Sequence, residues 1–397
     1  MRILFLCRFL PHSLARDSGR LDSYHYIKSL CAEHAVSVIA FVPPEDEPGV
    51  AELERLCERV VAVPYDRDGV MARLWRLGGR LWRPQVYGRN YSGAYRRALH
   101  RLLAERSFDV AVVHGMMAGY GRDLHPIPAV LDEVDLFSMV AHQLYRNAVN
   151  PFVRLWLGFD WLRTLAWETS YLHTYQAVFV RSTKDEAVVR ELAPQQAVAV
   201  LPPWFEGLEE LQTIPLVRPA GNTILFVGAM NIPPNIDAVC FFAQQVFPEL
   251  RQLVPDAQFR IVGAKPVPAV QQLSQEPGVM VVGEVPSLTP HYAAAAVVVA
   301  PLFVGGGIIV KTLNGMASGR PMVATPIGNS GTGAEDGRHL RLVAPDPTAM
   351  AQAIAELLLD DRLWQQFAQN GREFILSNYS WPKTITTMTS MLQKAVD

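Results

Sequence analysis

The chain has 397 residues, of which half are hydrophobic, and its formal net charge at neutral pH is −2. This length predicts two domains of ordinary size, and the apolar content is enough to fill two cores. The balanced charge argues against a general nucleic-acid binder, which would present a basic surface. Four cysteines are scattered without the spacing of a zinc site or a disulfide framework: Cys7, Cys31, Cys57 and Cys240. We find no apolar run of membrane-span length and no signal-peptide pattern, so we expect a cytoplasmic protein.

The first half of the chain alternates between short apolar runs and segments of helical period. The apolar runs are rich in Val, Ile and Leu on both faces, as expected for parallel strands covered by helices. They predict buried strands at residues 2–7, 36–42, 59–63, 109–113, 128–132, 176–180 and 197–201. Between the first two strands, apolar residues recur at helical spacing: Leu21, Tyr24, Ile27 and Leu30. This alternation predicts an α/β fold with a doubly wound parallel sheet.

Residues 69–106 differ from the rest of the chain because they contain nine arginines and a single acidic residue. Four of the arginines would share one face of a helix: Arg73, Arg76, Arg80 and Arg83. With Leu and Trp on the same turns, such a helix suits an anionic membrane surface and predicts peripheral contact with the inner membrane through residues 70–106. The alternative is a surface helix whose apolar side packs on its own domain, and the Gly pair at 78–79 weakens any continuous helix.

A second series of apolar runs follows the first. It predicts strands at residues 223–228, 257–262, 278–282, 296–300, 321–324 and 340–343. Helical segments separate these strands, notably 235–253 and 308–318, and the pattern is helical after Asp346. Between the two series, residues 202–222 form an irregular stretch that begins with two prolines, and we expect the interdomain linker there.

Residues 301–325, PLFVGGGIIVKTLNGMASGRPMVAT, carry the most informative motif of the chain. The motif predicts a strand end, a loop of three glycines, a helix, a turn and the next strand. Gly305, Gly306 and Gly307 remove side chains from the junction, so backbone N–H groups can point at an anion with the helix dipole behind them. Lys311 adds a movable positive charge, and the whole unit suits a diphosphate. The alternative is a glycine-rich turn in any α/β protein.

The same stretch resembles the donor-site signature of the group 1 glycosyltransferases, the family 4 retaining enzymes of the GT-B fold. Four more segments follow the order and spacing of that family: residues 226–230, 233–238, 259–263 and 279–286. The first half matches more loosely, at residues 1–6, 17–20 and 130–135. The resemblance implies two Rossmann-like doubly wound domains that face a cleft. They would be an acceptor domain over residues 1–205, a donor domain over 206–378, and a last helix over 379–397 that returns to the first domain.

The resemblance also implies which residues hold a nucleotide-sugar donor. In the second domain, backbone groups at strand ends would contact the base, Asn314 would face the ribose, and Lys311 with the glycine loop would hold the diphosphate. In the first domain, the loop after the first strand would approach the donor phosphate or the acceptor. The implied donor-binding residues are Gly19, Arg20, Gly228, Met230, Val262, Gly263, Gly283, Val285, Gly305, Gly306, Gly307 and Asn314. For the strand-end glycines, the alternative is that they only let the strands turn.

Three residues are candidates for catalysis: His114, Asp135 and Lys311. His114 and Asp135 follow predicted strands of the first domain, at the carboxyl edge where ligands bind in open α/β sheets. Asp135, with Asp132 and Glu133, is suited to bind acceptor hydroxyls or to assist proton transfer. The alternatives are a capped polar residue for His114, ordinary loop acids for the cluster, and a surface lysine for Lys311.

We expect no metal site and no cofactor, since the nucleotide sugar would serve as co-substrate. The chain has no isolated Asp-x-Asp between apolar strands, so leaving-group charge would be neutralised by Lys311, an arginine and helix N-termini. Two positions depart from the family pattern: Ile309 stands where Arg is usual, and Asn314 stands where Glu is usual. Ile carries no charge, and a neutral amide binds a hydroxyl less strongly than a carboxylate does.

Together these observations predict a metal-independent glycosyltransferase, and the family resemblance implies that it retains the anomeric configuration. Its acceptor would be a glycan, a lipid-linked intermediate or a small molecule, as in polysaccharide biosynthesis. A rival hypothesis is a non-catalytic protein of the same fold that serves as a binding or activating subunit, and Ile309 and Asn314 support it. A third hypothesis is an epimerase of nucleotide sugars, which the motifs fit less well.

Overall fold

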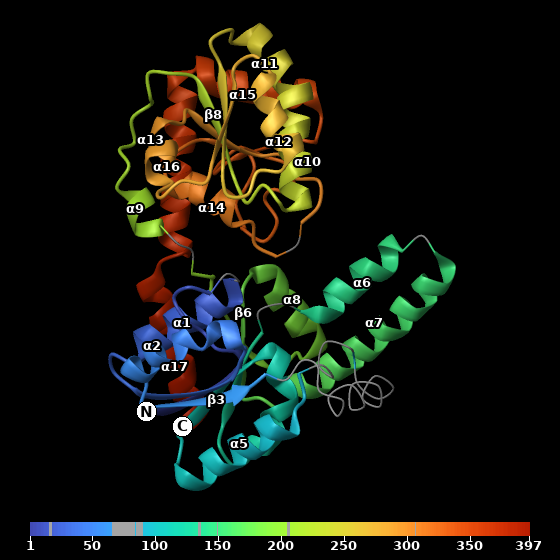
Figure 1. Cartoon of the computed structure of the whole chain (residues 1–397), viewed down its shortest axis with the longest axis vertical. Coiled ribbons are helices and arrows are strands. Elements are labelled where there is room, and N and C mark those ends of the chain that lie inside the picture. Colours follow the sequence, from blue (N-terminus) through green and yellow to red (C-terminus); the bar gives the residue numbers. More distant parts are fainter. Residues whose placement is uncertain are drawn as a thin grey trace. The chain divides into compact units, whose positions relative to one another are not determined.

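The structure is a computed structural model that describes residues 1–15, 18–65, 84, 90–133, 136–148, 150–204, 207–305 and 307–397. The chain divides into two compact units (Figure 1). Unit 1 combines Met1–Trp204 with Trp381–Asp397, and unit 2 comprises Phe205–Ser380. Each unit is built on one parallel sheet with the strand order of a Rossmann fold, so the predicted fold class is confirmed.

Unit 1 contains a seven-stranded sheet with the order β3-β2-β1-β4-β5-β6-β7. Its strands are β1 (Arg2–Phe9), β2 (Ala35–Val42), β3 (Arg59–Pro64), β4 (Val110–His114), β5 (Ala129–Asp132), β6 (Ala177–Val180) and β7 (Ala197–Val200). Each coincides with one of the predicted apolar runs. The strand order reverses between β1 and β4, and ligands bind at the carboxyl ends of the strands at such a reversal.

Both faces of this sheet are buried, because successive residues of one strand enter different cores. Ile3 and Phe5 of β1 are buried in one core, and Leu4 and Leu6 are buried in the other. The first core includes residues of α1 (Ser18–Leu30), α2 (Pro48–Leu56) and α17 (Trp381–Val396). The second includes residues of α5 (Gly93–Glu105) and the 3-10 segment Gly115–Leu124. Burial on both faces explains why the strands read as continuous apolar runs.

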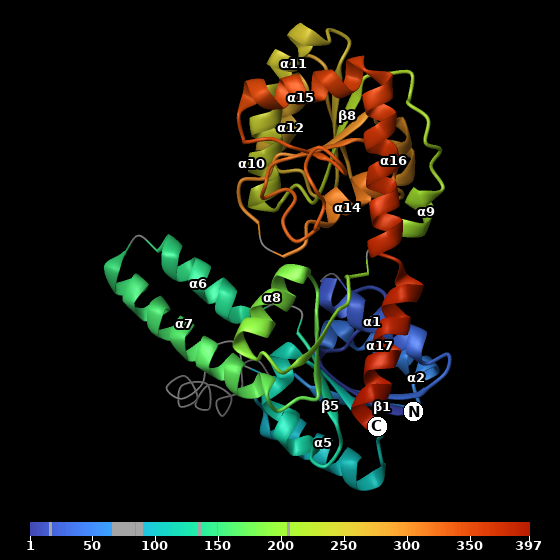
Figure 2. The same cartoon turned by 180° about the vertical axis from the view of Figure 1, so that it is seen from behind.

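The last helix, α17, belongs to the core of unit 1 although it follows unit 2 in the sequence. Met388 and Leu392 are fully buried there, and the ring of Trp381 stacks on the ring of Tyr26 with 5.0 Å between their centres. In Figure 2, α17 lies beside α1. Unit 1 is therefore assembled from two segments that are distant in the sequence.

The basic segment is described in part. Helix α5 packs on unit 1 through Tyr95, Leu99 and Leu102, which are buried, while its Arg96 pairs with Asp123 at 2.7 Å. For α5, then, the alternative holds: it is a surface helix packed on its own domain. The arginines of the predicted amphipathic helix lie outside the described residues: Arg73, Arg76, Arg80 and Arg83.

Helices α6 (Phe137–Asn147) and α7 (Pro151–Leu172) form a hairpin that projects from the rest of unit 1 (Figures 1 and 2). We call this hairpin the arm. Where α7 meets unit 1, the buried carboxylate of Glu168 accepts a hydrogen bond at 3.0 Å from the backbone N–H of Ser138, in the first turn of α6. This bond satisfies one of the free N–H groups at the start of α6 and fixes the two helices to each other. After the arm, α8 (Thr183–Leu192) connects β6 to β7.

Unit 2 contains a six-stranded parallel sheet with the order β10-β9-β8-β11-β12-β13. Its strands are β8 (Thr223–Val227), β9 (Gln258–Val262), β10 (Val279–Gly283), β11 (Val297–Ala300), β12 (Met322–Ala324) and β13 (Arg341–Leu342). Ile224 and Phe226 of β8 are buried in one core, and Leu225 and Val227 are buried in the other. Here the strand order reverses between β8 and β11.

The helices of unit 2 follow the predicted pattern with one interruption. They are α9 (Leu208–Gln212), α10 (Pro233–Phe241), α11 (Phe247–Leu253), α12 (Pro268–Gln272), α13 (Thr289–Ala294), α14 (Val310–Ala317), α15 (Pro347–Leu359) and α16 (Asp361–Asn378). The single helix predicted over 235–253 is divided into α10 and α11 by a π-helical turn, Phe242–Val246. Pro248 follows this turn, and the wider turn accommodates a residue that lacks an N–H and whose ring would clash with the preceding helix.

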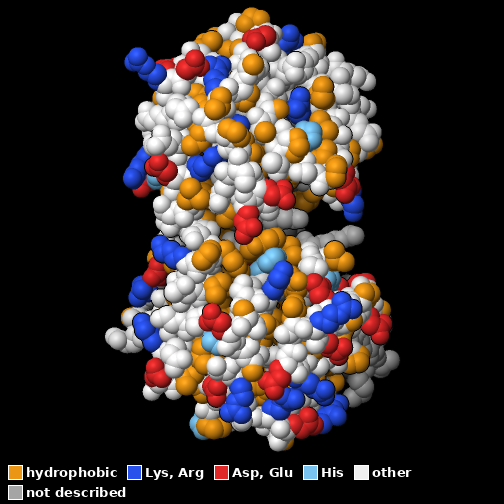
Figure 3. Space-filling view, turned by 90° about the vertical axis from the view of Figure 1, so that its left-hand side faces the viewer, with side chains coloured by type: hydrophobic (Ala, Val, Ile, Leu, Met, Phe, Trp, Pro, Cys, Tyr) orange, Lys and Arg blue, Asp and Glu red, His pale blue; other side chains and the backbone are white. Residues whose placement is uncertain are grey.

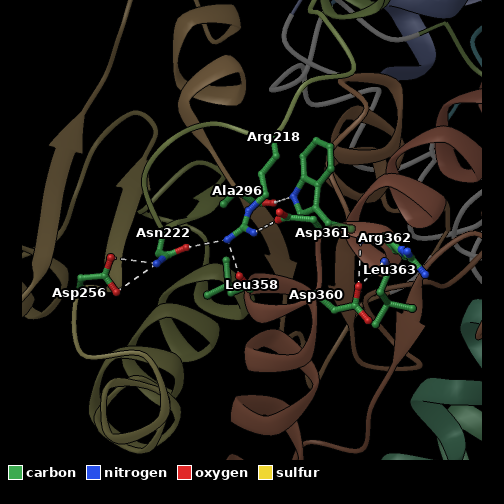
Figure 4. Close-up of polar contacts among 10 residues, drawn as sticks. Arg218, Asn222, Asp256, Ala296, Leu358, Asp360, Asp361, Arg362 and Leu363 are labelled. Carbon is green, nitrogen blue, oxygen red and sulfur yellow. Dashed lines mark hydrogen bonds and ion pairs between the residues drawn. The ribbon is translucent and has the colours of Figure 1, made fainter.

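The amino ends of the unit 2 strands are joined by polar contacts. Arg218 donates hydrogen bonds to the carbonyl oxygen of Leu358 and to the carboxylate of Asp361 (Figure 4). Asn222, which precedes β8, donates to both carboxylate oxygens of Asp256, at 3.0 and 2.9 Å, just before β9. The contact between Asn222 and Asp256 thus joins the segments that lead into β8 and β9 at the amino edge of the sheet. The glycine-rich loops lie at the opposite edge.

The surface agrees with the near-zero net charge. On the face shown in Figure 3, Lys and Arg side chains are interspersed with Asp and Glu side chains in both units. Among the described helices, none is both long enough and apolar enough to cross a membrane.

Candidate functional site

The candidate donor site lies at the carboxyl edge of the unit 2 sheet, where the strand order reverses between β8 and β11. Gly228 follows β8, and the glycine loop follows β11 and leads into α14. Ligands of open α/β sheets bind at such a reversal, because adjacent loops diverge there to opposite faces of the sheet. The motif picked out in the sequence therefore occupies the position at which this fold binds ligands.

Lys311 reaches this edge from the first turn of α14. Its Nζ donates a hydrogen bond to Asn235 Oδ1 at 2.5 Å and lies 4.1 Å from the centre of the Phe226 ring. A Cβ atom at position 228 would lie only 3.1 Å from this Nζ, so Gly228 leaves room for the ammonium group. Burial lowers the pKa of Lys311 to about 7. Among the described residues no carboxylate pairs with Lys311, so an anionic ligand would supply the missing negative charge.

Three glycines allow the strand ends at this edge to approach one another closely. Gly263, after β9, has φ 150°, and a Cβ atom there would lie 1.8 Å from the carbonyl oxygen of Gly228. Its N–H donates to the carbonyl of Gly283 at 2.8 Å, and Gly283 itself has φ 85°. Only glycine adopts these conformations freely. The structure thus shows that these glycines are needed to connect the strands, and contact with a nucleotide base remains a prediction.

Two of the other predicted donor-binding residues, Met230 and Val262, have side chains buried in the two cores of unit 2. The N–H of Met230 donates to the carbonyl oxygen of Ala264 at 2.8 Å. Val285 is partly buried and packs against the core that contains Val262. Any contact of Met230 or Val262 with a donor must therefore use the backbone rather than the side chain.

The loop of three glycines is described except for Gly306. Gly305 is partly buried, and Gly307 has φ 67°, which glycine tolerates best. Helix α14 begins only at Val310, and the N–H of Ile309 donates to the carbonyl of Ser330 at 3.2 Å. One amide of the predicted anion site is therefore already bonded within the protein. The Ile309 side chain packs against the core of unit 2, where the family usually has Arg.

Asn314 is buried on α14, next to Tyr292 of α13. Burial raises the pKa of Tyr292, and the neighbouring Asn314 amide works against that rise. Among the described residues, none makes a hydrogen bond of good geometry with the Tyr292 hydroxyl or with Asn314 Oδ1. A buried polar atom without a partner is uncommon, and such an atom is suited to accept a hydrogen bond from a ligand.

Three residues of this site were missed from the sequence. Asn235 lies in a motif that was recognised, residues 233–238, but nothing in the pattern showed that its amide would bind Lys311. Tyr292 gave no signal because its neighbour Asn314 is on another helix. Lys265 has φ 55° in the loop after β9, a conformation that non-glycine residues seldom adopt, and it adds a second cation at this edge.

In unit 1, the candidate residues have partners within the protein. His114 ends β4, and its Nδ1 accepts a hydrogen bond at 3.4 Å from the N–H of Met116, which caps the following 3-10 segment. Gly19 lies in the first turn of α1 rather than in the preceding loop as predicted. Arg20 donates to the carbonyl of Leu10 and pairs with Asp46 at 2.7 Å. The contact of His114 agrees with the alternative that it is a capping polar residue. A role in donor binding remains a prediction for Gly19 and Arg20.

The acidic cluster after β5 is largely engaged in buried contacts. Asp132 forms an ion pair with Arg181 at 2.8 Å, and the same guanidinium lies 3.3 Å from Asp22. Glu133 accepts a hydrogen bond from the hydroxyl of Tyr171 at 2.9 Å. Asp135 lies outside the described residues. Arg181, directly after β6, was missed because its two carboxylate partners are 49 and 159 residues away in the sequence.

The described residues contain no group of three or more His, Cys, Asp or Glu side chains that could hold a metal ion.

Comparison with known proteins shows which family the candidate donor site belongs to. The family model of the glycosyl transferases group 1 matches residues 221–360, which include the glycine loop, Lys311 and Asn235. Residues 221–360 are a group 1 glycosyl transferase domain. This group 1 domain forms most of unit 2.

A curated relative aligns with part of the chain. The GDP-mannose-dependent alpha-(1-6)-phosphatidylinositol monomannoside mannosyltransferase of Mycolicibacterium smegmatis is 30% identical over 151 residues, which cover 34% of this chain and 40% of that protein. The chain spans less than half of the length of the two curated relatives it matches: 40% of the mannosyltransferase and 44% of a second protein, from Klebsiella pneumoniae.

Solved structures match nearly the whole chain. Sucrose-phosphate synthase from Thermosynechococcus elongatus has a TM-score of 0.64 at 17% identity and covers 99% of each chain. Anabaena Alr3699/HepE in complex with UDP has a TM-score of 0.67 at 13% identity, covering 99% of this chain and 100% of that chain. The chain therefore has the GT-B fold, and the group 1 domain forms most of its second unit.

Proposed function

We propose that the protein is a glycosyltransferase that moves a sugar from a nucleotide-sugar donor to a glycan, a lipid-linked intermediate or a small molecule. The observation that carries the proposal is the position of Lys311. Lys311, which has no carboxylate partner in the part of the chain that the structure describes, lies at the carboxyl edge of β8, beside a glycine, within the group 1 domain. This arrangement fits a diphosphate better than a neutral ligand, because burial of the ammonium group is unfavourable until an anion binds.

The class of donor is proposed from the same site and its relatives. The Anabaena protein was solved with UDP, and the mycobacterial relative is named for GDP-mannose. Both ligands contain a nucleoside diphosphate, so we assign that part of the donor to the edge formed by Gly228, Lys311 and the glycine loop. Asn314 Oδ1 would accept a hydrogen bond from a ribose hydroxyl in this arrangement.

The chemical step proposed for this site is departure of the nucleoside diphosphate from the sugar. Negative charge then grows on the diphosphate, and protonated Lys311 would stabilise it together with the N-terminus of α14. This stabilisation does not require a metal ion, and we propose metal-independent transfer. Retention of anomeric configuration is proposed from the resemblance of the motif to retaining enzymes. His114 and Asp135 remain proposed catalytic residues of unit 1.

The test is a panel of nucleotide sugars incubated with the full chain, with and without candidate acceptors, while nucleotide release is followed. We expect release from one donor class in the parent, a strong loss in Lys311→Met, and parental release in Arg338→Met, which removes an exposed cation of the same unit. Chelation of divalent metals should leave the rate unchanged, and NMR of the product reports the anomeric configuration. Absence of both nucleotide release and nucleotide binding would favour the non-catalytic subunit.

A further inference from the structure

The arm carries a concentration of exposed apolar side chains. Eight large hydrophobic residues of α6 and α7 are between 45% and 82% exposed: Val140, Leu144, Phe152, Val153, Leu155, Trp156, Phe159 and Leu162. Scattered single residues of this kind need no explanation, but a contiguous apolar surface on one element indicates an interaction site.

The exposed residues of α7 follow helical spacing. Phe152, Leu155, Trp156, Phe159 and Leu162 lie at positions i, i+3, i+4, i+7 and i+10, which places them along one side of the helix. In an ordinary surface helix such a stripe would face the core. Here it is exposed, while the neighbouring residue Trp161 packs against α6.

The arm is a well-packed structure rather than a loose extension. The ring of Trp161 stacks on His142 at 4.4 Å and on Tyr145 at 5.7 Å between ring centres. Gly158 lets the two helices approach, because a Cβ atom there would lie 3.1 Å from the Tyr145 ring. Asn150 caps the start of α7 by accepting hydrogen bonds from two backbone N–H groups. The apolar side is therefore held in a fixed, outward-facing arrangement.

The charge of the arm shows which partner fits. Between Phe137 and Trp167 the sequence contains three arginines and one acidic residue, a net charge of +2 with His neutral. The single acid, Asp160, pairs with Arg163 at 3.2 Å. Arg146 and Arg154 remain exposed without a carboxylate partner among the described residues, and the guanidinium of Arg154 lies over the Tyr145 ring at 5.2 Å.

We propose that the arm docks on an anionic lipid surface. Exposed Trp, Phe and Leu side chains can enter the region between the lipid headgroups and the acyl chains, and adjacent arginines bind anionic headgroups. A second copy of this chain fits less well, since a symmetric contact between two arms would place +2 against +2. The arm does not span the bilayer, and it lies on the membrane surface.

The position of the arm links membrane docking to the proposed sugar transfer. Helix α6 begins five residues after the end of β5, at the carboxyl edge of the unit 1 sheet. Docking of the arm brings that edge to the membrane, so an acceptor carried by a lipid fits the protein better than a freely diffusing one. This step rests on the proposed glycosyltransferase function, whereas docking itself is tested without any donor.

The experiment is cosedimentation of the full chain with phosphatidylglycerol vesicles and with phosphatidylcholine vesicles. We expect the parent to bind the anionic vesicles. The triple variant Phe152→Ser, Leu155→Ser, Trp156→Ser should bind about tenfold less because it loses the inserted side chains. The double variant Arg146→Gln, Arg154→Gln should lose the preference for anionic lipid. The matched control Val217→Ser, Leu359→Ser removes two equally exposed apolar residues of unit 2 and should bind as the parent does.

A second measurement avoids disruptive substitutions. Brominated phosphatidylglycerol should quench part of the parent tryptophan fluorescence, and Trp156→Phe should remove that quenched component.

Docking is wrong if the parent does not bind phosphatidylglycerol vesicles, or if the triple variant binds as well as the parent. It is also wrong if sedimentation velocity shows a parent dimer that the triple variant loses while neither binds vesicles, because a second copy then covers the face. If vesicles bind but no transfer from any donor occurs, docking stands and the proposed function does not.

Discussion

The ammonium group of Lys311 lies 2.5 Å from the side-chain oxygen of Asn235 and is held over the ring of Phe226. Asn235 lies in the first turn of α10, after β8, and Lys311 lies in the first turn of α14, after β11, so the contact joins the two connections that diverge at the reversal of the sheet. Asn235 supplies a neutral acceptor, which orients the lysine without cancelling its charge. The pair is therefore suited to receive an anion.

Binding of a nucleoside diphosphate should take up a proton near neutral pH. In the free protein, burial lowers the pKa of Lys311 to about 7, and a bound diphosphate would raise it. Affinity should therefore decrease as the pH rises above about 7, because the free lysine must first be protonated. Calorimetry in two buffers of different ionisation enthalpy measures this uptake.

The variant Lys311→Met should lose the proton uptake and bind a nucleoside diphosphate more weakly by about 1.5–3 kcal/mol, the range for a charge-assisted hydrogen bond. The control Arg338→Met should behave as the parent. Equal affinity and equal proton uptake in Lys311→Met and parent would remove Lys311 from the site.

Asn314→Glu should strengthen binding of a nucleoside diphosphate by about 1 kcal/mol, since an ionised acceptor binds a ribose hydroxyl more strongly than an amide does. Inorganic pyrophosphate lacks ribose and should show no gain. Titration of both ligands against parent and variant measures the difference. If the variant loses nucleotide binding while its free energy of unfolding stays unchanged, the pocket is built around Asn314.

Asp22 should make unit 1 less stable as the pH rises from about 4 to about 7. Its folded pKa is raised from 3.8 to about 7, chiefly by burial, with Arg181 opposing the rise and Asp132 adding to it. In this range the folded state holds more protons than the unfolded state, so the free energy of unfolding falls with increasing pH. Amide exchange in β5 and β6 reports on unit 1 separately. Asp22→Asn should remove this pH dependence, and Glu191→Gln, at an exposed site of the same unit, should keep it.

Met388→Ala should destabilise unit 1 by about 2–5 kcal/mol, the usual cost of truncating a buried Met. Met388 is fully buried in the core that contains Ile3 and Phe5 of β1. Amide exchange in β1 measures the change. The exposed neighbour Thr386→Ala should have little effect, and equal protection in both variants would show that α17 contributes little to the core.

The strands were predictable because both faces of each sheet are buried, and continuous runs of Val, Ile and Leu reveal this without knowledge of partners. The glycine loop was predictable for a different reason, because its glycines and Lys311 are close together in the sequence. The pairs Lys311–Asn235 and Arg181–Asp22 were not predictable, because the first joins residues 76 positions apart and the second joins residues 159 positions apart. The arm was missed because an apolar helix has the same pattern whether its stripe is buried or exposed.

The membership of α17 in unit 1 has a consequence for biosynthesis. Residues 1–204 emerge from the ribosome long before Trp381–Val396. Until α17 emerges, the core of unit 1 that contains Ile3 and Phe5 lacks Met388 and Leu392. Unit 2 is contiguous and has its complete core as soon as residue 380 emerges. The nascent chain should therefore complete its second unit before its first, and the first should remain open to chaperones and proteases for most of translation.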